Sequence, residues 1–235
     1  MNARQILVAL KRHADPKKAA FLPTFFKTGK GDYGEGDVFF GISVPDLRRL
    51  SKTYVGLSRT DIATLLRSRY HEARLLGLLI LVLQYQRGSS SEKSSVVEFY
   101  CRQFQRINNW DLVDTTAPYI LGDYLLHHPR GELLRYARSG HLWTERIAIV
   151  STFAFIRAGE FEDTLRIAEI FLTHDHDLIH KATGWMLREV GKRDADVLRE
   201  FLQKHARRMP RTMLRYAIER LSDVERARWM NRERS

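Results

Sequence analysis

Apolar residues recur at intervals of three and four along most of this chain. Clear examples are Ile6-Leu7-Leu10, Ile62-Leu65-Leu66 and Leu198-Phe201-Leu202. This period predicts amphipathic α-helices, and no segment shows the strict alternation that is typical of a β-strand. Breaks between helices are indicated at Asp15-Pro16, His128-Pro129, Ser139-Gly140, Ala158-Gly159 and Met209-Pro210. The segments between breaks are about 10 to 18 residues long, the usual size of helices in globular proteins.

A repeated pattern indicates how the predicted helices pack. Five of them carry related residues at a corresponding position, namely Arg74, Asp111, Arg146, Lys181 and Arg215. Successive positions are 37, 35, 35 and 34 residues apart, which is typical of stacked helix pairs and lies between the tetratricopeptide and HEAT periods. The alternative is that helices of about 15 residues give such intervals by accident. We expect an all-α protein whose residues 1–235 form a single domain, an α-solenoid of about six antiparallel helix pairs.

Positive charge dominates the composition and narrows the choice of partner. Lys and Arg total 39 against 28 Asp and Glu, which gives a formal net charge of +11. An anionic partner is therefore expected, with DNA or RNA first and a membrane surface as the rival. The longest apolar run, Leu75 to Leu83, is too short to span a bilayer. A single cysteine, Cys101, and the lack of an apolar signal segment favour a soluble monomer in the cytoplasm, associated with the nucleoid.

Four of the five aligned positions are basic, and this has a chemical consequence. In a solenoid, Arg74, Arg146, Lys181 and Arg215 are expected to form a row of cations along one concave wall, which suits a phosphate backbone. Asp111 interrupts the row, and Asp114 follows one turn later. An acid within a basic row is either a local salt-bridge partner or a catalytic group.

Two further segments have both a functional and an ordinary interpretation. Four glycines between Gly29 and Asp37 exclude a helix there. A nucleotide-binding loop is disfavoured because Lys30 is followed by Gly31 rather than by Ser or Thr, so this segment is either a loop that approaches DNA or a plain surface loop. His176 and His180 could share a helix face and bind a metal, but a helix cap by Asp175 or Asp177 is favoured, and we expect no metal or cofactor.

Three tryptophans accompany the aligned positions. Trp110 lies directly before Asp111, Trp143 lies three residues before Arg146, and Trp185 lies four after Lys181. Core packing is the ordinary role of a single tryptophan. Several of them beside one row of cations are instead suited to stacking on bases or on cationic groups.

Several motifs together resemble one known family. They are Asn109-Trp110-Asp111-Leu112-Val113-Asp114 followed by Pro118 and Leu121-Gly122, then Trp143-Thr144-Glu145-Arg146-Ile147-Ala148, then Lys181-Ala182-Thr183-Gly184-Trp185-Met186-Leu187-Arg188-Glu189, with the glycine-rich segment before them. In this order the motifs, which extend from about Lys27 to Arg220, resemble those of the AlkD-like DNA alkylation repair family.

The resemblance implies a fold and an activity. Members form a right-handed superhelix of HEAT-like helix pairs with a basic concave groove that holds duplex DNA. They hydrolyse the N-glycosidic bond of cationic alkylpurines such as 3-methyladenine and 7-methylguanine, without a metal and without flipping the base. Trp110, Asp114 and Trp185 match the family's catalytic set, and Arg146 matches the basic residue beside it. We expect Asp111 to be structural.

A mechanism without a general acid is expected from these residues. A cationic base leaves as a neutral species, so only the sugar cation of the transition state needs stabilisation, which a single carboxylate such as Asp114 can supply. The predicted DNA-binding residues are Arg146, Lys181, Arg74, Arg215, Arg188 and Lys30, and the predicted partner is duplex DNA that contains alkylated bases. The alternatives are a non-catalytic solenoid that binds DNA or RNA and a protein-binding HEAT scaffold.

Overall fold

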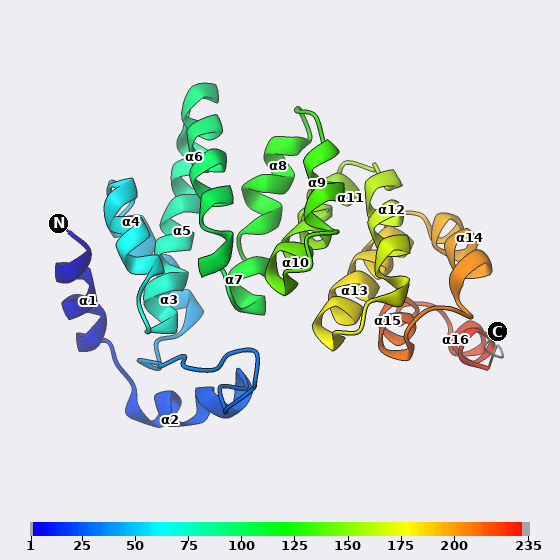
Figure 1. The fold of residues 1–235 in the computed structure, drawn as a ribbon, viewed down its shortest axis with the longest axis horizontal. Coiled ribbons are helices and arrows are strands. Elements are labelled where there is room, and N and C mark those ends of the chain that lie inside the picture. Colours follow the sequence, from blue (N-terminus) through cyan, green and yellow to red (C-terminus); the bar gives the residue numbers. More distant parts are fainter. Residues whose placement is uncertain (1, 232–235) are drawn as a thin grey trace. The chain divides into compact units, whose positions relative to one another are not determined.

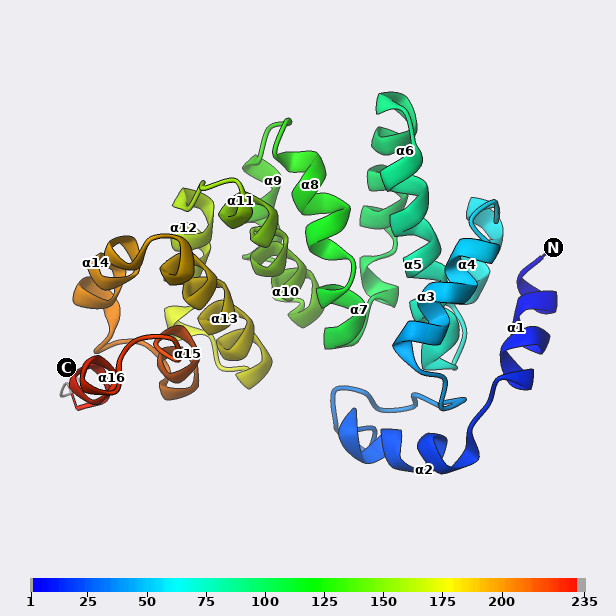
Figure 2. The same ribbon diagram turned by 180° about the vertical axis from the view of Figure 1, so that it is seen from behind.

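The computed structural model describes residues 2–231. These residues form α-helices and short 3-10 helices and contain no strand, although Val38 and Tyr70 form an isolated parallel bridge. The all-α prediction is therefore confirmed for the part of the chain that is described. The chain divides after Thr116 into two compact units, which Figures 1 and 2 show from opposite sides. Each unit is described by itself, and the single domain stays a prediction.

Unit 1 is built around one long helix. Its elements are α1 (Ala3–Arg12), α2 (Pro16–Phe25), α3 (Val44–Thr53), α4 (Arg59–Leu66), α5 (His71–Arg87), α6 (Ser90–Arg102), η1 (Phe104–Arg106) and α7 (Trp110–Asp114). Helix α5 packs against α3, α4, α6 and α7. The apolar run that is too short to span a membrane lies in α5, and almost all of it is buried. It forms the centre of this core.

Side-chain caps fix where several helices of unit 1 begin. Asn2 at the start of α1 and Ser89 at the start of α6 each form a capping box with the residue three positions later. Asp15 accepts hydrogen bonds from two backbone amides of α2, and Pro16 occupies the first helical position. The break predicted at Asp15-Pro16 is confirmed.

Helix α2 differs from its neighbours because it buries none of its own residues. Phe21 and Phe25 are 63% and 52% exposed. The start of α2 is held by the segment before α3, since the Asp15 amide donates to the Phe40 carbonyl at 2.8 Å. Gly41 has a φ of +83°, and a Cβ there would lie 2.2 Å from the Asp15 carbonyl oxygen, so only glycine permits this close approach.

Unit 2 surrounds a second long helix. Its elements are η2 (Ala117–Tyr119), α8 (Leu121–Leu125), α9 (Gly131–Tyr136), α10 (Leu142–Ser151), α11 (Phe153–Arg157), α12 (Glu162–Ile170), η3 (Phe171–Thr173), α13 (Asp177–Arg193), α14 (Ala195–His205), α15 (Arg211–Ala217) and α16 (Asp223–Met230). Helix α13 packs against α10, α11, α12, α14 and α15. The four breaks predicted in this part of the chain all fall between helices, so they are confirmed.

The five aligned positions of the repeat lie on five different helices. They are on α5, α7, α10, α13 and α15, each within the first five residues of its helix. Within each unit, helices that are neighbours in sequence also pack together, as α4 and α5 do in unit 1 and α13 and α14 in unit 2. This arrangement is consistent with an α-solenoid-like fold. Between residues 2 and 231, no helix has both the length and the apolar character needed to cross a membrane.

Candidate functional site

The central motif of the sequence forms α7, a helix of only five residues. Trp110 is its first residue and Asp114 its last. Asn109, which is fully buried, caps the helix because its Oδ1 accepts a hydrogen bond from the Trp110 amide at 2.8 Å. At the other end, Thr115 Oγ1 donates to the Asp111 carbonyl at 2.6 Å. So short a helix is unstable by itself, so its orientation depends on contacts with the rest of unit 1.

Aromatic rings hold the tryptophan of α7. The Phe26 ring stacks on Trp110 with centroids 5.4 Å apart and planes 22° apart, and Phe25 meets Trp110 edge to face at 5.8 Å. Phe26 also stacks with Phe39, with ring centroids 5.3 Å apart. The half-buried Trp110 is therefore one end of an aromatic wall that α2 and the segments after it provide.

His71, the first residue of α5, connects two carboxylates inside unit 1. Its Nε2 donates to Asp111 Oδ2 at 2.7 Å and its Nδ1 donates to Asp37 Oδ2 at 3.1 Å. An imidazole that donates from both nitrogens carries a positive charge. Burial alone would lower the pKa of His71, but the charge and hydrogen bond of Asp111 and the hydrogen bond of Asp37 raise it to about 9. The two carboxylates therefore favour the imidazolium form of His71 at neutral pH.

Asp37 is the second centre of this cluster. Its Oδ2 accepts from Arg74 Nη2 at 2.6 Å as well as from His71. Burial would raise the pKa of Asp37, but the hydrogen bond of His71 and the charge of Arg74 outweigh it and lower the pKa. Asp37, Asp111, His71 and Arg74 thus form a cluster of two negative and two positive groups, which we call the buried ionic cluster.

Arg74, a predicted DNA-binding residue, lies inside unit 1 and not at its surface. Arg74 is only 4% exposed, and its guanidinium is bound by Asp37 and by the Ser68 carbonyl at 3.1 Å. Its charge is neutralised inside unit 1 and does not belong to an exposed row. The repeat predicted correctly that Arg74 lies near the start of a helix. It did not predict the ion pair with Asp37, which lies 37 residues earlier.

Glu72 organises the segment that leads into α3. Its Oε2 accepts from the Phe40 amide at 3.0 Å, and its Oε1 accepts from the amides of Gly41 and Ile42 at 2.7 and 3.3 Å. Three backbone donors satisfy this buried carboxylate. Neither His71 nor Glu72 was singled out from the sequence, because their partners are between 30 and 40 residues away and no local spacing marks them.

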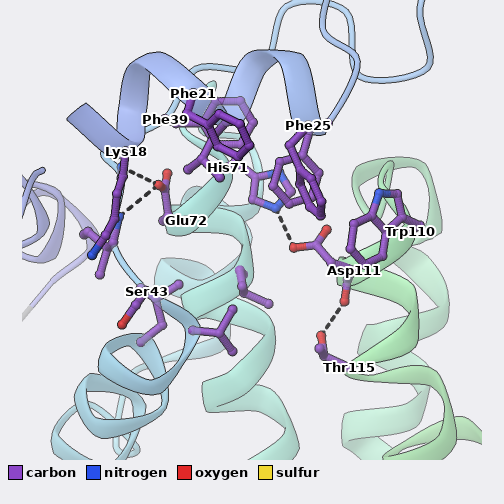
Figure 3. Close-up of a pocket in the computed structure, with 17 residues that line it drawn as sticks. Lys18, Phe21, Phe25, Phe39, Ser43, His71, Glu72, Trp110, Asp111 and Thr115 are labelled. Atoms are coloured by element: carbon purple, nitrogen blue, oxygen red, sulfur yellow. Dashed lines mark hydrogen bonds and ion pairs between the residues drawn. The ribbon is translucent and has the colours of Figure 1, made fainter. Parts of the chain in front are cut away.

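A cavity of about 470 Å³ lies among these groups. Figure 3 shows α2 above it, the aromatic side chains of Phe21, Phe25 and Phe39 gathered beneath that helix, and His71 directed at Asp111 beside Trp110. Aliphatic residues of α3 and α5, including Leu47 and Leu75, line another side. The cavity is mostly apolar, because Glu72 and Asp111 direct their oxygens to protein donors.

In unit 2, three predicted site residues lie on successive turns of α13. Lys181 Nζ is 2.7 Å from Asp177 Oδ2, and both side chains are partly exposed. Trp185, half-buried, packs against Phe153 with ring centroids 6.0 Å apart. Arg188 forms an ion pair with Glu219 of the turn after α15. Lys181, Trp185 and Arg188 therefore follow one another along α13 at intervals of four and three residues.

Arg146 is a buried residue of α10. It is 5% exposed, and its Nη1 donates to the Leu178 carbonyl in the first turn of α13 at 2.6 Å. The guanidinium of Arg146 therefore lies inside unit 2, and its predicted contact with DNA stays a prediction. The hydrogen bond to Leu178 satisfies a backbone carbonyl near the start of the helix that carries Lys181 and Trp185.

The histidines near the start of α13 are occupied by structural contacts. His176 is the N-cap of α13, and its Nδ1 accepts from the Leu178 amide at 3.1 Å; the prediction of Asp175 or Asp177 as the cap is wrong. His174 Nε2 lies 3.0 Å from Glu145 Oε2, and His180 Nε2 bonds the His174 carbonyl. Among residues 2–231, no cluster of potential metal ligands is found.

A run of exposed cations that no acid interrupts extends along the sequence from the end of α14 into α15. The exposed residues are Lys204, Arg207, Arg208, Arg211 and Arg215, with no Asp or Glu between Glu200 and Glu219. We call these five residues the α14–α15 basic surface. Arg215, a predicted DNA-binding residue, is a member. Lys30, another, is exposed in the glycine-rich segment of unit 1.

Comparison with known proteins adds two findings. Residues 6–221 match the family described as DNA alkylation repair enzyme. The structure is similar to that of a predicted DNA alkylation repair enzyme from Enterococcus faecalis, with a TM-score of 0.69 and 17% sequence identity over 90% of this chain and 98% of that one. No curated protein matches the sequence.

Proposed function

Because the chain belongs to the DNA alkylation repair enzyme family, we propose that it is a monofunctional DNA glycosylase that hydrolyses the N-glycosidic bond of cationic alkylated purines in duplex DNA. The expected lesions are 3-methyladenine and 7-methylguanine. The observation that carries the proposal is α7, where the family's motif residues Trp110 and Asp114 occupy one short helix braced by a buried ionic cluster.

The chemistry assigned to α7 needs one carboxylate. When a cationic purine leaves, the bonding electrons of the glycosidic bond go to the base, which departs neutral, and the sugar becomes an oxocarbenium-like cation. Asp114 stabilises that cation and orients the water that attacks it. No residue has to protonate the base, so the paired carboxylates of ordinary glycosidases are not required.

The resemblance assigns contact with the damaged nucleotide to Trp110 of unit 1 and to Trp185 of unit 2, and each tryptophan is considered within its own unit. Trp110 stacks on Phe26, and Trp185 packs against Phe153. A cation over an indole face gains about 0.5–2 kcal/mol, which favours an alkylated base over a neutral one. Within unit 2, Arg146 links α10 to α13, the helix that carries Trp185, through its bond to the Leu178 carbonyl.

Binding to the DNA backbone is assigned to the accessible cations. These are the exposed Lys30 and Arg215 with the other members of the α14–α15 basic surface, and the half-buried Lys181 and Arg188, whose ion pairs with Asp177 and Glu219 a phosphate would replace. The net charge of +11 supports a polyanionic partner. We also propose that the protein is an AlkD-like member of the family and a right-handed HEAT-like solenoid with a basic groove. It is proposed to act as a monomer associated with DNA in the cytoplasm.

Single-turnover release of free 7-methylguanine from alkylated duplex DNA tests the proposal. The parent protein is expected to release the base, and Asp114→Asn is expected to lose about 10²–10³ in rate while it folds and binds DNA as the parent does. The matched control is Asp123→Asn, which removes an exposed carboxylate of α8 outside the motif. If the parent binds DNA with no release of base, the non-catalytic solenoid is the better interpretation.

A further inference from the structure

We propose that His71 is a positioning residue for α7: it ties Asp111 of that helix to Asp37 of the glycine-rich segment and so fixes how Trp110 and Asp114 are presented to the damaged nucleotide. The inference rests on the proposed function for the role of Trp110 and Asp114. It gives a role to His71 and to the glycine-rich segment, neither of which takes part in the proposed reaction.

The need for such a tie follows from the length of α7. Five residues form little more than one turn and cannot hold a direction without outside contacts. The hydrogen bond from His71 to Asp111 at 2.7 Å links α7 to α5, the central helix of unit 1. Asp111 Oδ1 also accepts from the Leu112 amide at 2.8 Å, so the carboxylate that His71 holds is itself bonded to the backbone of α7.

The opposite nitrogen of His71 extends this tie to the glycine-rich segment. Asp37 Oδ2 accepts from His71 at 3.1 Å and lies 3.5 Å from Asn109 Nδ2, the amide group of the residue that caps α7. A single carboxylate oxygen therefore touches both the positioning residue and the cap. The segment that begins at Gly29 turns at Gly31 and Gly36, whose φ angles are +82° and +84°, and it delivers Asp37 to this point.

Charge balance makes His71 difficult to replace. The groups that face it are Asp37 from the glycine-rich segment, Asp111 from α7 and Arg74 from its own helix, with Arg74 Nη2 at 3.5 Å from Nδ1. Glu72 is turned to backbone amides. Removal of the imidazolium leaves two buried carboxylates with one cation, which is strongly unfavourable.

A second set of contacts runs in parallel with the ionic one. The His71 ring contacts both Phe26 and Phe39, at centroid distances of 4.7 and 5.2 Å, and these two rings also contact each other at 5.3 Å. Phe26 stacks in turn on Trp110. A charged imidazolium in contact with aromatic rings is stabilised by their electron-rich surfaces, so loss of the charge weakens the ring contacts and the carboxylate contacts together.

The experiment compares His71→Gln with the parent in single-turnover release of 7-methylguanine and in DNA affinity. Displacement of a catalytic group by about 1 Å can cost about 10²-fold in rate, and a loss of this order is expected with DNA affinity unchanged. The matched control is His205→Gln, because His205 also pairs with an acid, Glu169 at 3.3 Å, but lies on α14. Its rate is expected to equal that of the parent.

Two readouts separate positioning from a purely structural role. The release rate of the parent is expected to fall as pH rises through about 9, where His71 loses its proton, and this fall is expected to be absent in folded His71→Gln. In an Asp111→Asn background, His71→Gln is expected to cause little further loss, because the two residues act through one contact. A folded His71→Gln with the parent's rate and pH profile overturns the proposal.

A measurement without excision keeps the test independent of the proposed function and of variant folding. Nitrogen chemical shifts of His71 in the parent report whether both ring nitrogens carry protons at pH 7. A neutral imidazole there overturns the positioning role even if the protein releases base. An imidazolium in a parent that releases no base contradicts the proposed glycosylase and leaves the tie between α5 and α7 supported.

Discussion

Phe26 and Trp110 stack with their centroids 5.4 Å apart, so the first residue of α7 is held by a residue 84 positions earlier in the chain. The loss of this ring in Phe26→Ala is expected to destabilise unit 1 by about 3–5 kcal/mol, the usual cost of removing a buried phenylalanine. Urea denaturation measures the change. Phe21→Ala removes an exposed ring of the same cavity and is expected to stay within about 0.5 kcal/mol of the parent. Equal losses in the two variants would contradict this account.

Gly184 of α13 is required by close packing against α15. A Cβ at this position would lie 2.4 Å from the Met213 carbonyl oxygen and 2.5 Å from Tyr216 Cβ. Alanine favours a helix by about 0.5–1 kcal/mol over glycine, but overpacking costs about 1–3 kcal/mol, so Gly184→Ala is expected to be destabilising. Thermal unfolding is the measurement. Gly56→Ala, where a Cβ meets no atom within 4 Å, is the control, and a stabilised Gly184→Ala would refute the packing argument.

Stability is expected to depend on pH through His71. The folded-state pKa of about 9 is above the ordinary value of 6.5, so the folded state binds the proton more tightly than the unfolded state does. The resulting stabilisation is fully present below pH 6.5 and is lost as pH rises through about 9. The difference in unfolding free energy between the parent and folded His71→Gln should therefore narrow across this window. A constant difference from pH 6 to 10 would show that His71 does not titrate as expected.

The α14–α15 basic surface is expected to determine part of the salt dependence of DNA binding. Each phosphate that a cation neutralises contributes about 0.9 to the slope of log affinity against log salt. Replacement of Arg207, Arg208 and Arg211 by Gln should reduce that slope by about 0.9 for each phosphate that is no longer neutralised. Fluorescence anisotropy with undamaged duplex DNA measures it. The control replaces Arg102 and Arg135, exposed cations that already pair with Glu98 and Glu132. An equal change of the slope in the control would show that the α14–α15 basic surface has no special part in DNA binding.

Lesion choice is expected to follow the charge of the base. 3-methyladenine and 7-methylguanine leave as neutral species, whereas uracil and hypoxanthine need protonation or a tight polar pocket to leave. The cavity beside α7 is mostly apolar, and its acids are bound to protein donors. Parallel release assays on alkylated and uracil-containing duplexes should give base only from the first. Efficient release of uracil would refute the mechanism based on a cationic leaving group.

The helices could be predicted from the sequence because their signals are local. The three-and-four period, Pro16 and Pro210 near helix starts, and Gly140 and Gly159 in turns all act within a few residues of where they stand. The repeat also predicted that Arg74 and Arg146 lie near the starts of two helices, and they lie on α5 and α10. Burial could not be predicted in the same way, because it depends on acceptors that are distant in sequence.

The candidate site shows the same limit. Trp110 and Asp114 were identified because they belong to a contiguous motif, and their place on one helix follows directly. His71, Asp37 and Glu72 were missed because each acts on partners from about 30 to 40 residues away. The cap of α13 was assigned to an aspartate on general preference, but His176 takes that place because its imidazole nitrogen accepts the Leu178 amide.

The weak anchorage of α2 also affects how the cavity beneath it opens. A helix that buries none of its residues contributes little to the cooperative core, so it can unfold locally while α5 and α7 stay intact. Its amide protons should then exchange with solvent far sooner than those of α5. The free energy needed to open α2 then determines how easily a ligand reaches the aromatic wall. A large planar group can enter while the rest of unit 1 stays folded.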